Sequence, residues 1–175
     1  MKLKILFLGL ALLIIAAFGV TLVMNKKDIM KLTSSAFSHN QKIPSLYTCD
    51  GQNINPALSV SEVPRYAQSL VLIVDDPDAP AGTWTHWTVW DIDPNIAEIA
   101  EDSIPDGAIE GKTDFGKPGY GGPCPPSGTH RYFFRLYALD ITLSLPALSS
   151  VQDLLRLMKG HILDKAELVG LYSRK

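Results

Sequence analysis

A short apolar run, QSLVLIV at residues 68–74, limits the fold more than any other part of this chain. The run is too short for a typical helix and is rich in leucine and β-branched residues, which is typical of a strand buried on both faces. It ends in DDPDAP, residues 75–80, where two prolines interrupt strand pairing and three carboxylates crowd one turn. The sequence therefore predicts a central strand that stops at an acidic turn.

Two further segments have the period-two alternation of strands. In residues 83–92, TWTHWTVWDI, this alternation predicts two faces: Trp84, His86, Thr88 and Trp90 on one, and Thr85, Trp87, Val89 and Asp91 on the other. Residues 130–140, HRYFFRLYALD, are predicted to place alternate side chains on one side: His130, Tyr132, Phe134 and Leu136. A last strand is expected over residues 165–172. From Leu32 onward, short β-type blocks between turn residues are typical of an all-β sandwich or barrel.

A single helix is expected after Ser150, which forms a plausible N-cap with Asp153 and precedes an apolar stripe that ends near Met158. Residues 93–129 form an irregular stretch far longer than ordinary connections, and such loops are functional or disordered. At 175 residues the chain suits one domain. We therefore expect a mainly β protein: an antiparallel β-sandwich with one or two short helices over residues 31–175.

Residues 1–30 are expected to be a signal peptide or membrane anchor that contains an N-terminal hydrophobic helix. Residues 5–24 carry no formal charge and are flanked by lysines on both sides. Twenty apolar residues reach across a hydrocarbon core of roughly 30 Å, whereas the apolar region of a signal peptide usually has about 7 to 15 residues. The length favours an uncleaved membrane anchor over a cleaved signal peptide. In either case the domain is expected to be membrane-anchored or exported, on the periplasmic or extracellular face.

Setting aside the four lysines that flank this segment leaves 12 basic against 18 acidic residues. This excess of negative charge argues against a nucleic-acid surface, which needs clustered Lys and Arg. The two cysteines, Cys49 and Cys124, have no CxxC spacing for a metal or redox site. They pair as a disulfide or stay buried as thiols, and both alternatives remain open.

Residues 116–134, GKPGYGGPCPPSGTHRYFF, join a Gly/Pro-rich loop to the strand that begins at His130. Glycines permit close approach, so the N–H groups of Gly119, Gly121 and Gly122 are candidates for an anion-binding nest. Prolines 123, 125 and 126 stiffen this loop. With His86, His130 and Tyr132 as further donors, the sequence predicts a pocket for a phosphate-like group.

The motifs in combination resemble the phosphatidylethanolamine-binding protein family, in particular its bacterial and archaeal Raf kinase inhibitor-like branch. The resemblance is carried by DPDAP, by the W-x-H-W-x-V strand, by GYGGPCPPSGTHRYFFRLYALD and by YTCDGQNINPALSV at residues 47–60. It implies an antiparallel β-sandwich with an anion pocket at one end. The residues that match the family's pocket are Asp76, His86, His130 and Tyr132, with Gly122 and Pro123 at the rim and Trp84 and Pro80 as walls.

Family members bind phosphate, acetate-like anions or phospholipid head groups, and some eukaryotic members restrain kinases or proteases. The leading interpretation is therefore a small-anion binding protein of the envelope that regulates a kinase or protease, without a cofactor or catalytic residue. One alternative is a purely protein-partner inhibitor. Another is a hydrolytic enzyme using Asp76, His86 and His130, with Ser127 nearby, or with Asp78 as a fourth metal ligand. The natural ligand, cleavage of the leader and oligomeric state stay open.

Overall fold

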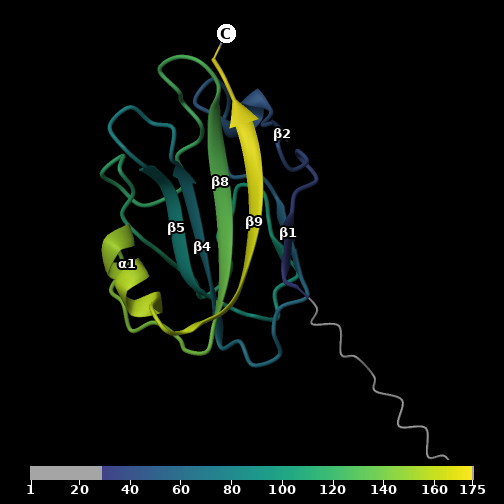
Figure 1. The fold of residues 1–175 in the computed structure, drawn as a ribbon, viewed down its shortest axis with the longest axis vertical. Helices are drawn as coiled ribbons and strands as arrows, with labels where there is room; N and C mark the ends of the chain where they lie inside the picture. The colour runs from purple at the N-terminus through teal and green to yellow at the C-terminus, as the bar shows by residue number, and fades with distance from the viewer. Residues whose placement is uncertain (1–28, 175) are drawn as a thin grey trace, which may run out of the picture.

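The computed structural model describes residues 29–174 (Figure 1). The hydrophobic helix expected over residues 5–24 lies outside the described residues. Within residues 29–174, no helix combines the length and the hydrophobicity needed to cross a membrane.

The described chain forms two β-sheets and a single α-helix. The larger sheet has six strands in the order β2-β9-β8-β4-β5-β7, and the smaller has three in the order β1-β3-β6. The strands and helices are β1 (Lys31–Thr33), β2 (Gln41–Lys42), the 3-10 turn η1 (Ser45–Tyr47), β3 (Leu58–Ser61), β4 (Ser69–Asp76), β5 (Trp84–Ile92), β6 (Glu98–Ile99), β7 (Ile109–Glu110), β8 (His130–Leu139), α1 (Val151–Met158) and β9 (Ile162–Tyr172).

The predicted mainly β sandwich is confirmed, with one departure from antiparallel pairing. The short β2 runs parallel to β9, pairing Gln41 with Gly170 and Lys42 with Leu171. The predicted helix is also confirmed: Ser150 and Asp153 form a capping box at the N-terminus of α1.

Apolar side chains fill both sides of the larger sheet. Between the two sheets lies the main core, which includes Leu72, Trp87 and Phe134. The opposite face of the larger sheet packs a smaller cluster, which includes Trp90, beneath α1 (Figure 1). Because β4 lies between β5 and β8 and has layers on both faces, all eight of its residues are buried. The predicted central strand is therefore confirmed.

The predicted regular alternation along β5 is wrong, because this strand contains two register shifts. Val74 of β4 pairs with Trp87, but Asp75 pairs with Thr85, so His86 is an extra residue in the ladder. His86 therefore faces the inner side of the sheet together with Trp87, and its ring meets that of Tyr132. A second shift follows Val89, and Trp90 packs on the α1 side.

Met30, near the start of the described residues, lies at one end of the long β8–β9 pair. The N–H of Met30 donates to Asp164 Oδ2 at 3.1 Å, and Asp164 pairs with Ala138. At the other end of the same pair, where β8 begins and β9 ends (Figure 1), His130 pairs with Tyr172. About eight residues of strand, roughly 27 Å, separate these two ends.

Candidate functional site

A cavity of about 340 Å³ lies at the end of the larger sheet where β4 stops and where β5 and β8 begin. Three of its polar side chains come from these strands: Asp76, His86 and Tyr132. The remaining walls are largely apolar and consist of Ala79, Pro80, Ala81, Trp84, Phe115, Cys124 and Pro126.

Asp76 is buried, and both of its carboxylate oxygens accept hydrogen bonds. Oδ2 accepts from His130 Nδ1 at 2.7 Å, and Oδ1 accepts from the N–H of Asp78 at 2.8 Å. His130 is also buried and does not line the cavity. The predicted ligand contact His130 is therefore placed behind Asp76, where its Nδ1 donates to the carboxylate and orients it.

His86 projects into the cavity because of the bulge in β5. Its Nδ1 donates to the carbonyl oxygen of Gly121 at 2.5 Å, and the N–H of Gly121 donates back to the carbonyl of His86 at 3.0 Å. Within residues 29–174 no side chain or carbonyl bonds its Nε2, so this nitrogen is left for a ligand. Burial lowers the pKa of His86, which favours the neutral ring.

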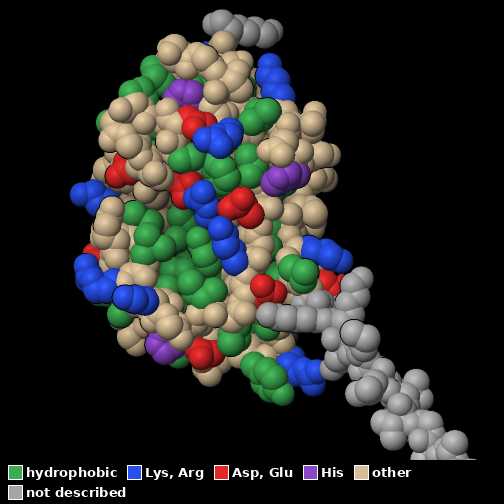
Figure 2. Space-filling view, viewed as in Figure 1, with side chains coloured by type: hydrophobic (Ala, Val, Ile, Leu, Met, Phe, Trp, Pro, Cys, Tyr) green, Lys and Arg blue, Asp and Glu red, His purple; other side chains and the backbone are tan. Residues whose placement is uncertain are grey.

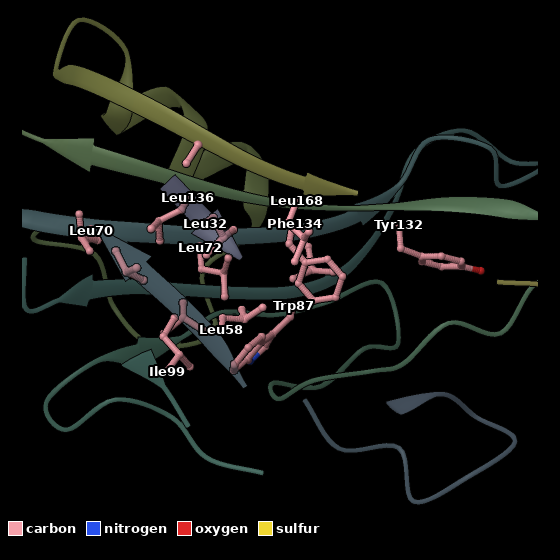
Figure 3. Close-up of a cluster of buried hydrophobic side chains, with 14 of the residues drawn as sticks. Leu32, Leu58, Leu70, Leu72, Trp87, Ile99, Tyr132, Phe134, Leu136 and Leu168 are labelled. Carbon is pink, nitrogen blue, oxygen red and sulfur yellow. The ribbon is translucent and has the colours of Figure 1, made fainter. Parts of the chain in front are cut away.

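Tyr132 contributes a hydroxyl with no partner. Its side chain is fully buried, and within the described chain Oη makes no hydrogen bond. Figure 3 shows the ring at the end of the row of core side chains, with the hydroxyl directed away from the cluster. Burial and the charge of Asp76 raise the pKa of Tyr132, so the phenol stays protonated and can donate.

Aromatic rings form the side of the cavity that faces the long loop. Phe115 packs edge-on against Trp84, with centroids 5.6 Å apart, and against His86, at 5.3 Å. Asp114 holds this part of the loop to β5: its Oδ2 accepts from the N–H of Thr85 at 2.6 Å, and its own N–H donates to the carbonyl of Thr85 at 3.1 Å. The predicted walls Pro80 and Trp84 both line the cavity.

The prediction that Gly121 and Gly122 contribute N–H groups to an anion-binding nest is wrong. The N–H of Gly121 is bonded to His86, and that of Gly122 donates to Asn53 Oδ1 at 2.7 Å, so neither points at a ligand. The glycines are needed for close packing of the chain instead. A Cβ on Gly122 would lie 2.4 Å from the carbonyl oxygen of Tyr47, and one on Gly121 would lie 2.3 Å from the ring of Phe115.

A disulfide joins Cys49 to Cys124 across the loop. The same connection is reinforced by the N–H of Cys49, which donates to the carbonyl of Pro123 at 3.1 Å. Cys124 lines the cavity, whereas Gly122 and Pro123 lie behind this wall. The predicted rim residues therefore position the wall and do not line the cavity.

The alternative chemistries find little geometric support. Asp78 accepts three hydrogen bonds from the backbone and guanidinium of Arg131, which lower its pKa to about 2. It lies outside the cavity. Across residues 29–174 no three His, Cys, Asp or Glu side chains are grouped to hold a metal. Ser127 is exposed, and His130 Nδ1 is already committed to Asp76.

A larger hollow of about 460 Å³ is lined by Trp87, Asn55 and Glu110, among other residues. Its central polar groups are already paired: Trp87 Nε1 donates to Glu110 Oε1 at 2.7 Å, and Asn55 Nδ2 donates to the carbonyl of Ala100 at 2.8 Å. The smaller cavity, with its unpartnered Tyr132 hydroxyl, is the better candidate for a ligand site.

Sequence reasoning missed two kinds of residue in this site. Phe115 is an aromatic residue in a loop otherwise rich in glycines, prolines and charged residues. An aromatic side chain in such a loop could have been predicted to pack against the site. Asn53 holds Gly122 from 69 positions away and has no distinguishing local pattern. Ala79, Cys124 and Pro126 line the cavity from within motifs that the sequence did mark, and Ala81 follows directly after one of them.

Comparison with known proteins identifies relatives over nearly the whole described chain. The family model for phosphatidylethanolamine-binding protein matches residues 33–173. A UPF0098 protein of Methanothermobacter thermautotrophicus is 52% identical over 150 residues, covering 83% of this chain and 99% of the relative. A UPF0098 protein of Pyrococcus horikoshii is 46% identical over 175 residues, covering 95% and 87%.

Two solved structures of the same family have a fold similar to that of this chain. A putative phosphatidylethanolamine-binding protein homologue, CT736 of Chlamydia trachomatis, has a TM-score of 0.82 and 45% identity, covering 85% of this chain and 99% of that one. Escherichia coli YbcL, described as a new member of the mammalian family, has a TM-score of 0.79 and 30% identity, covering 83% and 99%. With the motifs, the fold and these matches in agreement, the chain belongs to the phosphatidylethanolamine-binding protein family.

Proposed function

We propose that this protein binds a small anion, such as phosphate or the phosphoryl part of a phospholipid head group, in the cavity lined by Asp76, His86 and Tyr132. The observation that carries the proposal is the buried Tyr132 hydroxyl without a partner. A buried donor left unpaired costs about 1 to 3 kcal/mol, and an anionic oxygen would remove that cost. The Nε2 of His86 supplies a second donor once the ring is protonated.

Asp76 restricts which anions fit. A carboxylate would repel a fully charged anion, but its two oxygens are already bonded to His130 and to the N–H of Asp78. A monoanion that keeps at least one proton, such as dihydrogen phosphate or the monoanion of a phosphate monoester, can accept from the donors and donate to the carboxylate. The apolar walls at Pro80, Trp84 and Phe115 suit a short carbon substituent on that group.

Isothermal titration calorimetry at pH 5.5 is the direct test, with inorganic phosphate, a short alkyl phosphate and acetate at millimolar concentrations. We expect heat of binding from the phosphates, with the alkyl phosphate bound more tightly because its substituent contacts the apolar walls. The absence of any phosphate binding at this pH would overturn the proposal. A crystal structure grown with the tightest ligand should then place it against Tyr132 Oη.

We further propose that the domain is exported and held at a membrane by residues 5–24, with its pocket facing away from that membrane. A disulfide such as Cys49–Cys124 is typical of oxidising compartments. Met30 enters at the end of the β8–β9 pair opposite His130, so an anchor just upstream would hold the pocket on the distal side of the domain. In this orientation a free phosphate or phosphate monoester would reach the pocket from solution, whereas the head groups of the anchoring membrane would not. Protease protection of intact cells and spheroplasts, read with an antibody to the domain, tests the exposed location.

A further inference from the structure

Basic side chains in the middle of the larger sheet are paired with carboxylates: Arg135 of β8 bonds both Asp75 and Glu167. Figure 2 shows acidic and basic side chains next to one another in the middle of this face, and a basic side chain exposed near the end of the molecule where β9 finishes. Lys42 of β2 differs from the paired cations, because within residues 29–174 its Nζ forms neither an ion pair nor a hydrogen bond.

A cavity of about 380 Å³, here called the β9 cavity, lies beside Lys42 where β9 ends. Its lining consists of Lys42, Ser45, Asp50, Tyr172, Ser173 and Arg174. Because Tyr172 pairs with His130 at the start of β8, the β9 cavity lies at the same end of the larger sheet as the anion pocket. The two cavities share no lining residue, so they are separate sites.

Asp50 is the one carboxylate among the residues that line the β9 cavity, and both of its oxygens are occupied. Oδ2 accepts from the hydroxyl of the buried Tyr172 at 2.8 Å, and Oδ1 accepts from Arg174 Nε at 3.2 Å. Lys42 and Arg174 against this carboxylate leave the lining with one positive charge. The rest of the domain has more acidic than basic residues, so a positively charged cavity stands out in this protein.

Several donors of the β9 cavity are unpaired and open to solvent. Within the described chain no hydrogen bond is made by Lys42 Nζ, by Nη1 or Nη2 of Arg174, or by the hydroxyls of Ser45 and Ser173. Lys42 and Ser45 are exposed, and the side chain of Arg174 is 53% exposed. A ligand can therefore reach these donors. Ammonium, guanidinium and hydroxyl groups together are typical of sites that hold oxyanions.

We propose that the β9 cavity binds a fully ionised oxyanion, such as sulfate or the dianionic phosphoryl group of a phosphate ester, between Lys42 and Arg174. The ammonium and the unpaired Nη groups donate charge-assisted hydrogen bonds to the oxyanion. The hydroxyls of Ser45 and Ser173 donate to its remaining oxygens. Asp50 does not exclude such an anion, because its charge is offset by Arg174 and its position is fixed by Tyr172.

The anion pocket favours a different protonation state of its ligand. Asp76 is among the side chains that line that pocket, so an anion bound there must keep a proton to donate to the carboxylate. Sulfate carries no proton at neutral pH. Sulfate is therefore a probe that distinguishes the β9 cavity from the anion pocket.

Nuclear magnetic resonance titration of the full-length protein in a nonionic detergent with sodium sulfate at neutral pH tests this inference, with sodium chloride used to keep the ionic strength constant. We expect amide shift changes at residues 41–45 and 171–174, and none in β5. Lys42→Gln should weaken sulfate binding about tenfold, as expected for losing a hydrogen bond between charged groups. Lys42→Arg should restore most of the affinity. Because Lys42 is exposed on a two-residue strand, both variants are expected to fold.

Lys165→Gln is the matched control, since it removes one positive charge from β9 outside the cavity, and sulfate binding should persist. Tyr132→Phe alters only the anion pocket, so it should leave the sulfate titration unchanged while it weakens phosphate binding at pH 5.5. The failure of one site is thus distinguishable from the failure of the other. The proposal would be overturned by the absence of shifts around Lys42 and Arg174 at millimolar sulfate, by equal weakening in Lys42→Gln and Lys165→Gln, or by loss of sulfate binding in Tyr132→Phe.

Discussion

The Nδ1 of His130 lies 2.7 Å from Oδ2 of Asp76, and the side chains of both residues are more than nine-tenths buried. The pair links the start of β8 to the end of β4 directly behind the proposed anion pocket. It also explains why an acidic residue is tolerated beside that pocket. Its loss should therefore affect the stability of the domain as well as the site.

Replacement of His130 by alanine is expected to destabilise the domain by about 3 kcal/mol, because it leaves a buried carboxylate unpaired. His161 and Asp140 offer a matched control: their Nδ1–Oδ1 distance is 2.8 Å, but the side chains are 41% and 46% exposed. His161→Ala should cost less than about 1 kcal/mol. Urea unfolding at pH 7 measures both changes, and equal losses would contradict the importance of burial here.

The Tyr132 hydroxyl is expected to act in binding and not in stability. Tyr132→Phe should leave the free energy of unfolding unchanged or slightly higher, because the deleted donor has no partner. Phosphate affinity should fall about tenfold by calorimetry. Tyr120→Phe is the control, since its hydroxyl donates to the carbonyl of Tyr47 at 2.9 Å. That variant should lose about 1 kcal/mol of stability and keep its phosphate affinity.

His86 predicts a particular pH dependence. Its folded-state pKa is lowered by burial, so between about pH 6.5 and that lower value the unfolded chain takes up a proton that the folded chain does not. The contribution of His86 to stability is therefore complete above about pH 6.5 and falls as the pH drops through this window. Below about pH 6.5 the free energy of unfolding should therefore fall less in His86→Gln than in the parent protein, as measured by urea unfolding at several pH values.

Bound phosphate should raise the pKa of His86, because the anion favours the charged ring. Titration of the His86 Cε1–H resonance with and without phosphate measures this shift. A midpoint unaffected by saturating phosphate would remove His86 from the proposed ligand contacts.

Gly122 tests whether the loop glycines serve packing. A Cβ at this position would lie 2.4 Å from the Tyr47 carbonyl oxygen and 2.6 Å from Asn53 Oδ1, so Gly122→Ala should cost about 2 to 3 kcal/mol. Gly128 has open space around it and a φ of 69°, so Gly128→Ala should cost only about 1 kcal/mol. Thermal unfolding compares the two variants, and a harmless Gly122→Ala would argue against the packing role.

The disulfide is expected to stabilise both the domain and one wall of the pocket. The disulfide joins residues 75 positions apart, and in the chain-entropy model such a loop raises the free energy of unfolding by about 4 kcal/mol. The double variant Cys49→Ser, Cys124→Ser should lose a comparable amount in urea, and its phosphate affinity should fall severalfold because Cys124 lines the cavity. Thiol titration of the unreduced parent should find no reactive thiol. Unchanged stability of the double variant would contradict this account.

The strands were predictable where side-chain pattern alone determines them. The run at residues 68–74 had to be central because it is apolar on both faces, and β8 kept its alternation from His130 to Leu136. The helix was marked by its cap. In β5 the alternation failed, because a bulge depends on how two strands pair and leaves no mark in the sequence of one of them.

The structure brings several of the predicted site residues to one cavity, but it gives others different contacts from those expected. His130, Gly122 and Pro123 were expected to touch the ligand, yet each supports a neighbour: His130 holds Asp76, Gly122 packs on Tyr47, and Pro123 accepts from Cys49. Such roles depend on contacts between segments far apart in the chain. Residue type and local spacing carry no information about them.

The bulge at His86 adds an inward side chain without displacing any other. Trp84 still lies opposite Asp76 and Trp87 opposite Val74, as they would in an uninterrupted ladder without position 86. His86 is thus an extra residue between two paired positions of β5, and it does not take the place of a paired residue. A chain lacking His86 would keep Trp84 paired with Asp76 and Trp87 paired with Val74. It would lose the imidazole and the residue that bonds Gly121. The site could therefore be lost while the sheet is kept.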